Sequence, residues 1–275
     1  MPDGWGDCME IGEVKCKGIL GKSGIGGMDY AVNPYLGCSH ACAYCYARFM
    51  RRMGHPGEAW GSFVDIKVNA VDVLRDEAPR KPRGRVMLSS VTDAYQPLER
   101  ERRLTRRCLE VLLEYGYGVD ILTKSDLVLR DIDLFKRFDD VEVGLTITSL
   151  DDGVRRVFEP GASPIPSRLE ALRKLSDEGI PTYAFLGPML PYLSDDRLGE
   201  LLNVLVDRVS RLLVDRLNIK CGNMPDIRGV LDIYYPDLKL MFESALKAES
   251  QYYKDLKARV VRLCEDRAIP VRVVY

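Results

Sequence analysis

The sequence has almost no net charge and no long apolar run. Its 275 residues include 40 lysines and arginines against 41 aspartates and glutamates, a formal charge of −1. That balance argues against a protein that works by general electrostatic attraction to polyanions. No segment approaches about 18 uncharged apolar residues, and the charged N-terminus lacks the apolar core of a secretion signal. We therefore expect a cytoplasmic protein with no membrane-spanning segment.

Internal repeats and low-complexity segments are also absent. A chain of this length completes its core without disulfides or a structural metal, so stability does not explain its eight cysteines. In a reducing cytoplasm a close group of cysteines indicates a metal site or a catalytic group. Three of them, Cys38, Cys42 and Cys45, are close together. The other five are scattered without the spacing of metal ligands: Cys8, Cys16, Cys108, Cys221 and Cys264.

Short apolar runs alternate with segments of helical spacing. The predicted strands are 30–36, 64–68, 85–91, 119–123, 141–147, 182–186 and 212–219. The predicted helical segments are 46–53, 71–77, 98–115, 127–138, 151–158, 195–209 and 227–266. One more helix is predicted between 158 and 182, opened by a capping box of Ser167 and Glu170 and ended by Gly179. The strands are almost continuously apolar, which is typical of a parallel sheet covered by helices.

About six alternations fall short of the eight of a closed barrel. The sequence therefore favours an α/β fold with a partial (β/α)6 TIM-like barrel and a helical C-terminal extension, and a doubly wound flat sheet is the second choice. We expect a single domain over 1–275, with a core at about 30–223, an N-terminal extension at 1–29 and a helical region at 224–275. In either fold, loops at the carboxyl ends of the strands should build the site.

The motif CSHACAYC spaces Cys38, Cys42 and Cys45 by three and then two residues. Thiolates are the usual ligands of iron-sulfur clusters, and three of them leave one iron of a four-iron cluster free of protein ligands. An open metal position implies a small-molecule ligand that chelates metal. The alternative is a structural zinc ion with His40 as fourth ligand. The motif's place at a strand-to-helix junction favours the cluster, because zinc knuckles usually form small modules.

With Tyr44 before its last cysteine, the motif resembles the signature of the radical S-adenosylmethionine superfamily. NPYLGCSHACAYCYARFM, followed by VTDAYQPLE, LTKS and TIT, is similar to the spore photoproduct lyase-like group over about 30–223. The resemblance implies a 4Fe-4S cluster on Cys38, Cys42 and Cys45 that binds S-adenosyl-L-methionine and cleaves it to methionine and a 5'-deoxyadenosyl radical, which abstracts hydrogen from the substrate. It also implies a reductant protein such as ferredoxin or flavodoxin, and a nucleic-acid substrate.

Two features depart from the resembling families. The Gly-Gly-Glu triplet usual after the second strand is absent, and its place is taken by the segment from Ser89 to Asp93. The hydrogen-donating cysteine of spore photoproduct lyase falls at Val91, so the resemblance does not carry lyase activity over to this chain.

Several polar residues near the motif and at strand ends are candidate cofactor contacts: Tyr44, Ser90, Thr92, Asp93, Lys124, Thr146 and Thr148. The alternatives are a helix cap for Thr92 and Asp93, a solvated side chain for Lys124, and β-propensity for the later threonines. Cys221 could offer a thiol to a substrate radical, or pack as a small hydrophobe. Glu99 is expected to be a first-turn acid favoured by the helix dipole.

Arginines and lysines gather near residues 48–52, 80–85 and 102–107, and tyrosines near 234–235 and 252–253. They could form a phosphate track and base-stacking platforms, but a solvated, acid-balanced surface and helix packing are the favoured interpretations. The resemblance thus implies a radical enzyme, and modification or repair of a nucleic acid is the first choice for its reaction. A radical enzyme acting on a small metabolite or protein, and a zinc-stabilised nucleic-acid-binding protein, are the alternatives.

Overall fold

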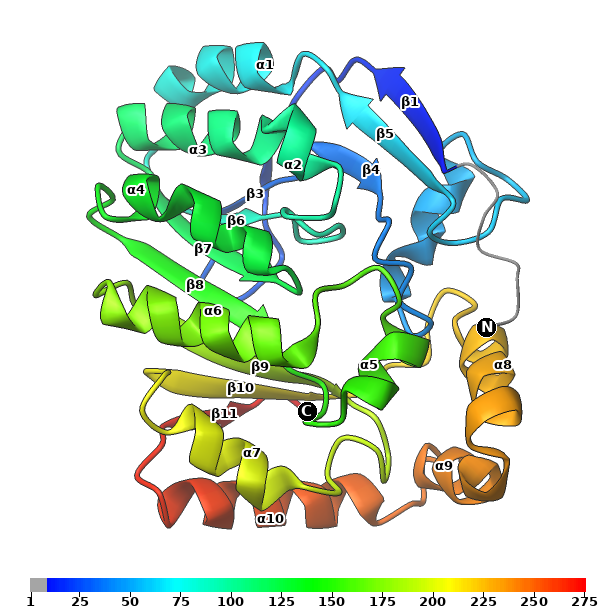
Figure 1. Cartoon of the computed structure of the whole chain (residues 1–275). Helices are drawn as coiled ribbons and strands as arrows, with labels where there is room; N and C mark the ends of the chain where they lie inside the picture. The colour runs from blue at the N-terminus through cyan, green and yellow to red at the C-terminus, as the bar shows by residue number, and fades with distance from the viewer. Residues whose placement is uncertain (1–8) are drawn as a thin grey trace.

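An eight-stranded sheet forms the centre of the described chain, residues 9–275, in the computed structural model (Figure 1). Its order is β11-β10-β9-β8-β7-β6-β3-β2, and all neighbours are parallel except β2 and β3. The strands are β2 (Leu20–Lys22), β3 (Tyr30–Val32), β6 (Arg85–Leu88), β7 (Gly118–Thr123), β8 (Val141–Thr146), β9 (Thr182–Met189), β10 (Arg211–Arg216) and β11 (Val271–Val273). The sheet stays open between β2 and β11, which confirms the predicted partial barrel and excludes a closed one within the described residues.

Helices cover the outer face of this sheet. The helices on that face are α1 (Ala70–Glu77), α2 (Glu99–Arg102), α3 (Leu104–Glu114), α4 (Ile132–Phe135), α6 (Ile165–Asp177), α7 (Leu198–Leu205) and α10 (Tyr252–Glu265). Beyond the carboxyl ends of the strands lie α5 (Asp152–Phe158), α8 (Met224–Tyr234) and α9 (Lys239–Ala245) (Figure 1). Short 3-10 helices complete the set: η1 (Tyr46–Arg52), η2 (Ala78–Arg80), η3 (Asp126–Asp131) and η4 (Pro236–Leu238). No helix of the described residues has the length and apolarity needed to cross a membrane.

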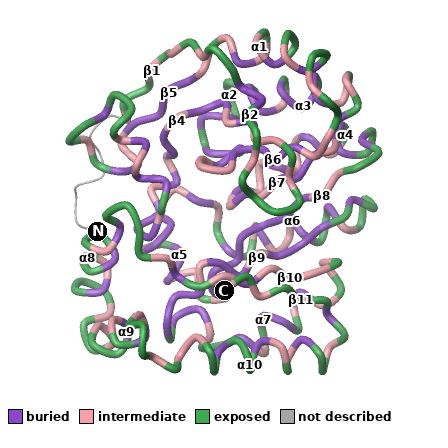
Figure 2. Tube along the Cα trace, turned by 180° about the vertical axis from the view of Figure 1, so that it is seen from behind, coloured by how far each residue is buried: buried purple, intermediate pink, exposed green. Residues whose placement is uncertain are grey.

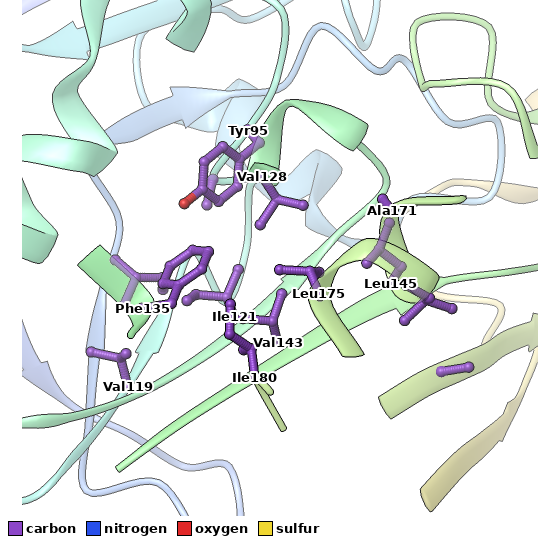
Figure 3. Close-up of a cluster of buried hydrophobic side chains, with 14 of the residues drawn as sticks. Tyr95, Val119, Ile121, Val128, Phe135, Val143, Leu145, Ala171, Leu175 and Ile180 are labelled. Carbon is purple, nitrogen blue, oxygen red and sulfur yellow. The ribbon is translucent and has the colours of Figure 1, made fainter. Parts of the chain in front are cut away.

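The hydrophobic core lies between the sheet and these helices. Val119 and Ile121 of β7 and Val143 of β8 are fully buried, and they lie close to Phe135 of α4 and Leu175 of α6 (Figure 3). In Figure 2 most residues of the middle strands β6, β7, β8 and β9 are buried, whereas β2 and β11 at the sheet edges are mostly half-buried or exposed. Because side chains alternate along a strand, the residues between these positions face the other side of the sheet, where the barrel interior lies.

A second, three-stranded sheet has the order β1-β5-β4, with β1 at Glu10–Val14, β4 at Tyr35–Gly37 and β5 at Phe63–Lys67. The run predicted at 64–68 is therefore a strand, but it does not belong to the barrel. The strand predicted at 30–36 is broken between β3 and β4. The break falls at Pro34, whose missing N–H cannot continue a ladder.

Other boundaries also differ from the prediction. The capping box is wrong, because α6 begins at Ile165 and Ser167 lies inside it. The Asp152 carboxylate accepts the Ile165 N–H instead, at 2.9 Å. The helix predicted at 98–115 is split at Arg103, whose φ of 49° is left-handed. Segment 46–53 is largely a 3-10 helix, and the region 224–275 ends in β11, which the helical pattern did not predict.

Candidate radical-enzyme active site

The three motif cysteines line one cavity of about 1030 Å³ on the inner side of the sheet. They lie on the loop between β4 and η1. Other parts of the chain pack tightly against this loop. Gly37 has a φ of +81°, and a Cβ added to it would lie 2.4 Å from the Phe63 carbonyl oxygen. At Gly161 a Cβ would come 2.1 Å from the Ser39 carbonyl oxygen. Only glycine fits at either position, because real Cβ atoms do not approach this closely.

Side chains near the motif and distant from it in sequence satisfy the backbone of the cysteine loop. Gln96 Oε1 accepts the Ser39 N–H at 3.0 Å, and Arg48 donates to the Ala43 carbonyl at 2.8 Å. Asn223, which is fully buried, donates to the carbonyl of Tyr44 at 2.9 Å. Paired backbone groups hold a buried loop in one conformation, so the three thiols keep fixed positions.

Burial raises the pKa of each of the three thiols, to about 12 for Cys42, and nearby acids raise that of Cys38 further. The thiols therefore keep their protons at neutral pH unless a metal displaces them. Among the described residues the three sulfur atoms do not all lie within 4.8 Å of one another. Ligands of a single tetrahedral zinc ion would be about 3.8 Å apart, given Zn–S bonds of about 2.3 Å. The wider spacing suits a larger metal group.

Five of the predicted cofactor contacts line the same cavity as the cysteines, namely Ser90, Thr92, Asp93, Lys124 and Thr146. They come from the carboxyl ends of β6, β7 and β8, which parallel pairing brings to one edge of the sheet. These polar residues at the strand ends therefore line one cavity, as the sequence led us to expect.

The other three candidates lie elsewhere. Tyr44 belongs to the cysteine loop, but its side chain is buried outside the cavity lining, and its hydroxyl donates to Glu159. Thr148 donates to the same carboxylate at 3.0 Å. Cys221 is exposed in the turn after β10, with a φ of +54°. None of the three contributes to the cavity lining.

Asp93 is a structural anchor as well as a lining residue. Its carboxylate accepts from the Thr123 hydroxyl at 2.6 Å, from the Tyr95 N–H and from the Lys124 N–H, and His40 Nδ1 lies 3.3 Å away. Burial alone would raise the pKa of this carboxyl, but the His40 ring and the donors outweigh it and lower the pKa. Asp93 therefore ties β6, β7 and the cysteine loop together.

A buried ion pair that the sequence did not reveal supports the cysteine loop. Glu159 and Arg168 are both fully buried, with 2.5 Å between Oε2 and Nη2. Arg168 also donates to the carbonyls of Ser163 and Thr146. Burial alone would raise the pKa of Glu159, but Arg168 and then Lys124 lower it. Glu159 thus stays ionised and holds the Tyr44 hydroxyl beside the loop.

Lys124 is half-buried at the end of β7, with its ammonium 5.8 Å from the centre of the Tyr44 ring. Burial alone would lower its pKa, but the negative charges possible at Cys42, Glu159 and Asp93 raise it. Lys124 therefore brings a stable positive charge to the cavity next to the cysteines.

The opposite end of the cavity is a charged floor, defined here by side chains near the amino ends of the strands: Arg85, Asp120, Glu142, Tyr183 and Arg211. Arg211 lies 2.6 Å from Glu142, Arg85 lies 3.2 Å from Glu142, and the Tyr183 hydroxyl donates to Asp120 at 2.8 Å. Sequence reasoning missed this group. The available signal was a charged residue at an inward position of successive strands, as in GVDILT and VEVGLT.

Apolar side chains lie between the charged floor and the cysteines. They are Met87, Leu122, Phe185 and Leu213, one from each of four strands. Gly144 leaves room for the neighbouring Tyr183 ring, since a Cβ there would lie 2.3 Å from it. The cavity thus has a polar rim, an apolar middle and a charged floor.

The charged floor makes stability depend on pH through Asp120. Burial raises its pKa from 3.8 to about 6. The folded state then binds this proton more tightly than the unfolded state, so the stabilisation is present at low pH and is lost as pH rises through about 6. Relative to Asp120→Asn, the wild-type free energy of unfolding should fall by about 1.4 kcal/mol from about pH 5 to about pH 8. Urea titrations at both pH values measure this; parallel curves for the two proteins would contradict it.

The basic clusters and tyrosines mostly have structural partners. Ion pairs join Arg48 to Asp226, Lys81 to Glu77 and Arg106 to Asp131. Tyr252 and Tyr253 donate to Asp195 and to the Met189 carbonyl. These contacts match the acid-balanced and packing interpretations for the residues concerned.

Glu99 is a first-turn acid of α2, as the sequence predicted, but its carboxylate has a further structural role. It is fully buried, accepts the N–H groups of Leu104 and Thr105, and pairs with Arg130 at 2.8 Å. Its carboxylate therefore caps α3, the helix after its own, because the chain turns back at Arg103.

Cys8, one of the scattered cysteines, lies outside the described residues.

Comparison with known proteins gives the family. The model of the Radical SAM superfamily matches residues 32–205. An uncharacterised protein of Methanocaldococcus jannaschii is 42% identical over 187 residues, which cover 68% of this chain and 70% of that protein. An uncharacterised protein of Mycobacterium tuberculosis is 32% identical over 215 residues, which cover 74% of this chain and 62% of that protein.

The fold has a counterpart among solved structures. Spore photoproduct lyase complexed with dinucleoside spore photoproduct superposes with a TM-score of 0.67 over 96% of this chain and 82% of that chain, at 18% identity. At this identity the likeness shows the fold alone. The family match over most of the chain, together with the archaeal relative, shows that the protein belongs to the radical SAM superfamily and is an enzyme of that class.

Proposed function

We propose that the protein holds a 4Fe-4S cluster on Cys38, Cys42 and Cys45 and binds S-adenosylmethionine beside it. The observation that carries the proposal is the convergence of the thiols of two buried cysteines and one half-buried cysteine with a polar rim on one cavity. Two rim hydroxyls, Ser89 Oγ and Thr92 Oγ1, are buried with no hydrogen-bond partner among the described residues. Buried polar groups are nearly always paired, so a bound polar molecule would complete this rim.

The cluster and cofactor, when bound, supply reductive cleavage of the carbon-sulfur bond to methionine and a 5'-deoxyadenosyl radical. The chain's own residues position them. Three thiolates hold the metal group and leave one metal position free of protein ligands. Lys124 would pair its positive charge with the cofactor's carboxylate, and Ser90, Thr92 and Thr146 would offer hydroxyls to its polar groups. The apolar middle of the cavity excludes water from the reacting atoms.

Production of 5'-deoxyadenosine tests this function. Anaerobically reconstituted protein given dithionite and S-adenosylmethionine should be brown, contain iron and sulfide, and release 5'-deoxyadenosine. A colourless protein that retains one zinc ion and no iron after the same treatment would support the zinc-stabilised alternative instead.

We further propose that the substrate is a nucleic acid. The cavity of about 1030 Å³ is at the upper end of the usual size range for small-molecule sites, which gives room for a substrate group beside the cofactor. Lys220 and Arg272 are exposed at the lining of its β10–β11 side and have no ion-pair partner among the described residues. The neighbour in fold that was solved with a dinucleoside spore photoproduct supports the same substrate class.

The reaction proposed here is not that of spore photoproduct lyase. Val91 is the position at which the sequence resemblance puts the hydrogen-donating cysteine of the lyases. It lines the cavity, and its side chain has no S–H to donate. Hydrogen returned to a substrate radical would have to come from another group. We therefore propose a modification reaction. Cys221 does not replace the missing thiol, because it is exposed and lies outside the cavity lining.

Salt-dependent binding tests the substrate class. Wild-type protein should bind single-stranded or duplex oligonucleotides more weakly as salt rises. Lys220→Ala with Arg272→Ala should reduce the logarithmic salt slope by roughly one for each phosphate that the variant no longer neutralises. The matched control is Lys254→Ala with Arg262→Ala, which removes two exposed cations of α10 outside the cavity lining. Absence of salt-dependent binding by wild type would favour a small metabolite or a protein as substrate.

A further inference from the structure

A second group of metal-binding side chains lies outside the cavity. One ligand atom each from Glu10 of β1 and from His55 and Glu58 of the loop before β5 all lie within 4.8 Å of one another. His55 is 7% exposed. Nothing in the radical chemistry uses these residues, and none of them lines the cavity that holds the cysteines.

The histidine of this group is oriented as metal-binding histidines usually are. Its Nε2 lies 2.9 Å from Oδ2 of Asp65, a buried carboxylate, and its Nδ1 lies 2.8 Å from Oε1 of Glu58. A carboxylate on one ring nitrogen leaves the other nitrogen to the metal and fixes the ring plane. Asp65 therefore aims Nδ1 toward the two glutamates.

The surrounding strands are shaped to hold this arrangement. Gly12 pairs with Asp65 across β1 and β5, and a Cβ at Gly12 would lie 2.1 Å from Asp65 Oδ1. The His55 ring stacks on Phe63 with centroids 3.9 Å apart. Phe63 also contacts Gly37, the residue before Cys38. The group is thus rigidly placed behind the cysteine loop.

The charges of the group do not balance. Glu10, Glu58 and Asp65 together carry three negative charges, and His55 supplies at most one positive charge. Within residues 9–275 no lysine or arginine forms an ion pair with any of the three carboxylates. A divalent cation would neutralise this excess, which matters most for the half-buried Glu58, because a buried charge without full compensation is costly.

We propose that Glu10, His55 and Glu58 bind a divalent transition-metal ion, with zinc as the best match, and that Asp65 orients the histidine. One imidazole nitrogen and two carboxylate oxygens are an accepted zinc set, and solvent water completes the coordination. The ion takes the place of the proton between Nδ1 and Glu58, so one proton is released for each ion bound. It joins β1 to the loop that backs the cysteine motif and so stabilises that part of the fold.

Zinc content tests the proposal without relying on catalysis. Cluster-loaded protein, dialysed anaerobically against Zn²⁺ and then desalted, should retain one zinc ion per chain in addition to its iron, and its melting temperature should rise. Glu58→Gln should lose that ion. Asp65→Asn should weaken zinc binding by about 10- to 100-fold, as is usual for residues that orient a ligand. Glu13→Gln, which removes an exposed glutamate of the same strand, should keep the ion.

The Cys38→Ser, Cys42→Ser, Cys45→Ser triple variant separates this site from the cysteine site. With Co²⁺ as probe, it should bind one ion and show no sulfur-to-cobalt charge-transfer band. Retention of no zinc by cluster-loaded wild type would overturn the proposal, and so would equal zinc retention by Glu58→Gln. Either result leaves the proposed radical function intact, because 5'-deoxyadenosine formation is measured separately.

Discussion

Replacement of Cys42 by alanine is expected to abolish formation of 5'-deoxyadenosine from S-adenosylmethionine. The thiol lies at the centre of the three-cysteine motif and lines the cavity. Two remaining thiols cannot hold a four-iron cluster firmly, so the iron and sulfide content of the reconstituted variant should fall with the activity. Product is measured by chromatography after reduction with dithionite, and iron by a colorimetric assay on the same sample.

Cys16→Ser is the matched control for this variant. Cys16 is a half-buried cysteine whose thiol lies 3.5 Å from Asn69 Oδ1, and a serine hydroxyl can make the same hydrogen bond. This variant should retain iron and product at wild-type levels. If Cys42→Ala still released 5'-deoxyadenosine at a rate close to wild type, the assigned coordination would be wrong.

Replacement of Arg168 by methionine is expected to cause the largest loss of stability. The change leaves the Glu159 carboxylate fully buried without its ion-pair partner. Breaking a buried pair in this way costs about 3–5 kcal/mol, which corresponds to a fall in melting temperature of roughly 10 °C for a chain of this size. Because Glu159 also holds Tyr44 beside the cysteine loop, the variant should lose iron faster on dilution. Thermal melting of the anaerobic protein and iron release measure the two effects.

Two further variants test whether the loss of stability in Arg168→Met comes from the unpaired buried charge. Arg168→Met combined with Glu159→Gln removes both charges and should recover part of the stability, since no unpaired buried charge remains. Arg173→Met breaks an exposed ion pair on the same helix, with Glu170, and should leave the melting temperature unchanged. A melting temperature for Arg168→Met equal to that of Arg173→Met would show that the buried pair contributes nothing.

The proposed metal group, Glu10, His55 and Glu58, would help to hold the cysteine loop in place. His55 stacks on Phe63, and Phe63 contacts Gly37 directly before Cys38. The Glu159–Arg168 pair supports the same loop from its other side through Tyr44. A loop that must keep three thiols in place while a cluster is assembled benefits from support on both sides, because loops are otherwise the most mobile parts of a fold.

The sequence alone predicted the proposed cluster ligands, the fold class and most of the strands of the barrel. Ligand spacing in CSHACAYC is a local property, and the alternation of apolar strands with helices follows from the periodicity of side chains along the chain. Convergence of Ser90, Asp93 and Lys124 could also be predicted, because parallel strands place their carboxyl ends on one edge. These features depend on neighbours in the sequence or on a general rule of parallel sheets.

Only the tertiary structure decided which polar residues face the cavity and which support it from behind. Tyr44 and Thr148 were grouped with the cofactor contacts, yet both bind Glu159. Tyr44 is 115 residues from Glu159 and Thr148 is 11 residues from it, so no short sequence pattern contains either pair. Both contacts depend on how α5 packs against the cysteine loop. The buried Glu159–Arg168 pair and the Glu10–His55–Glu58 group were hidden for the same reason, because each depends on how separate elements pack together. The charged floor had a local signal, the charged residues at inward strand positions, but only the fold shows that they meet.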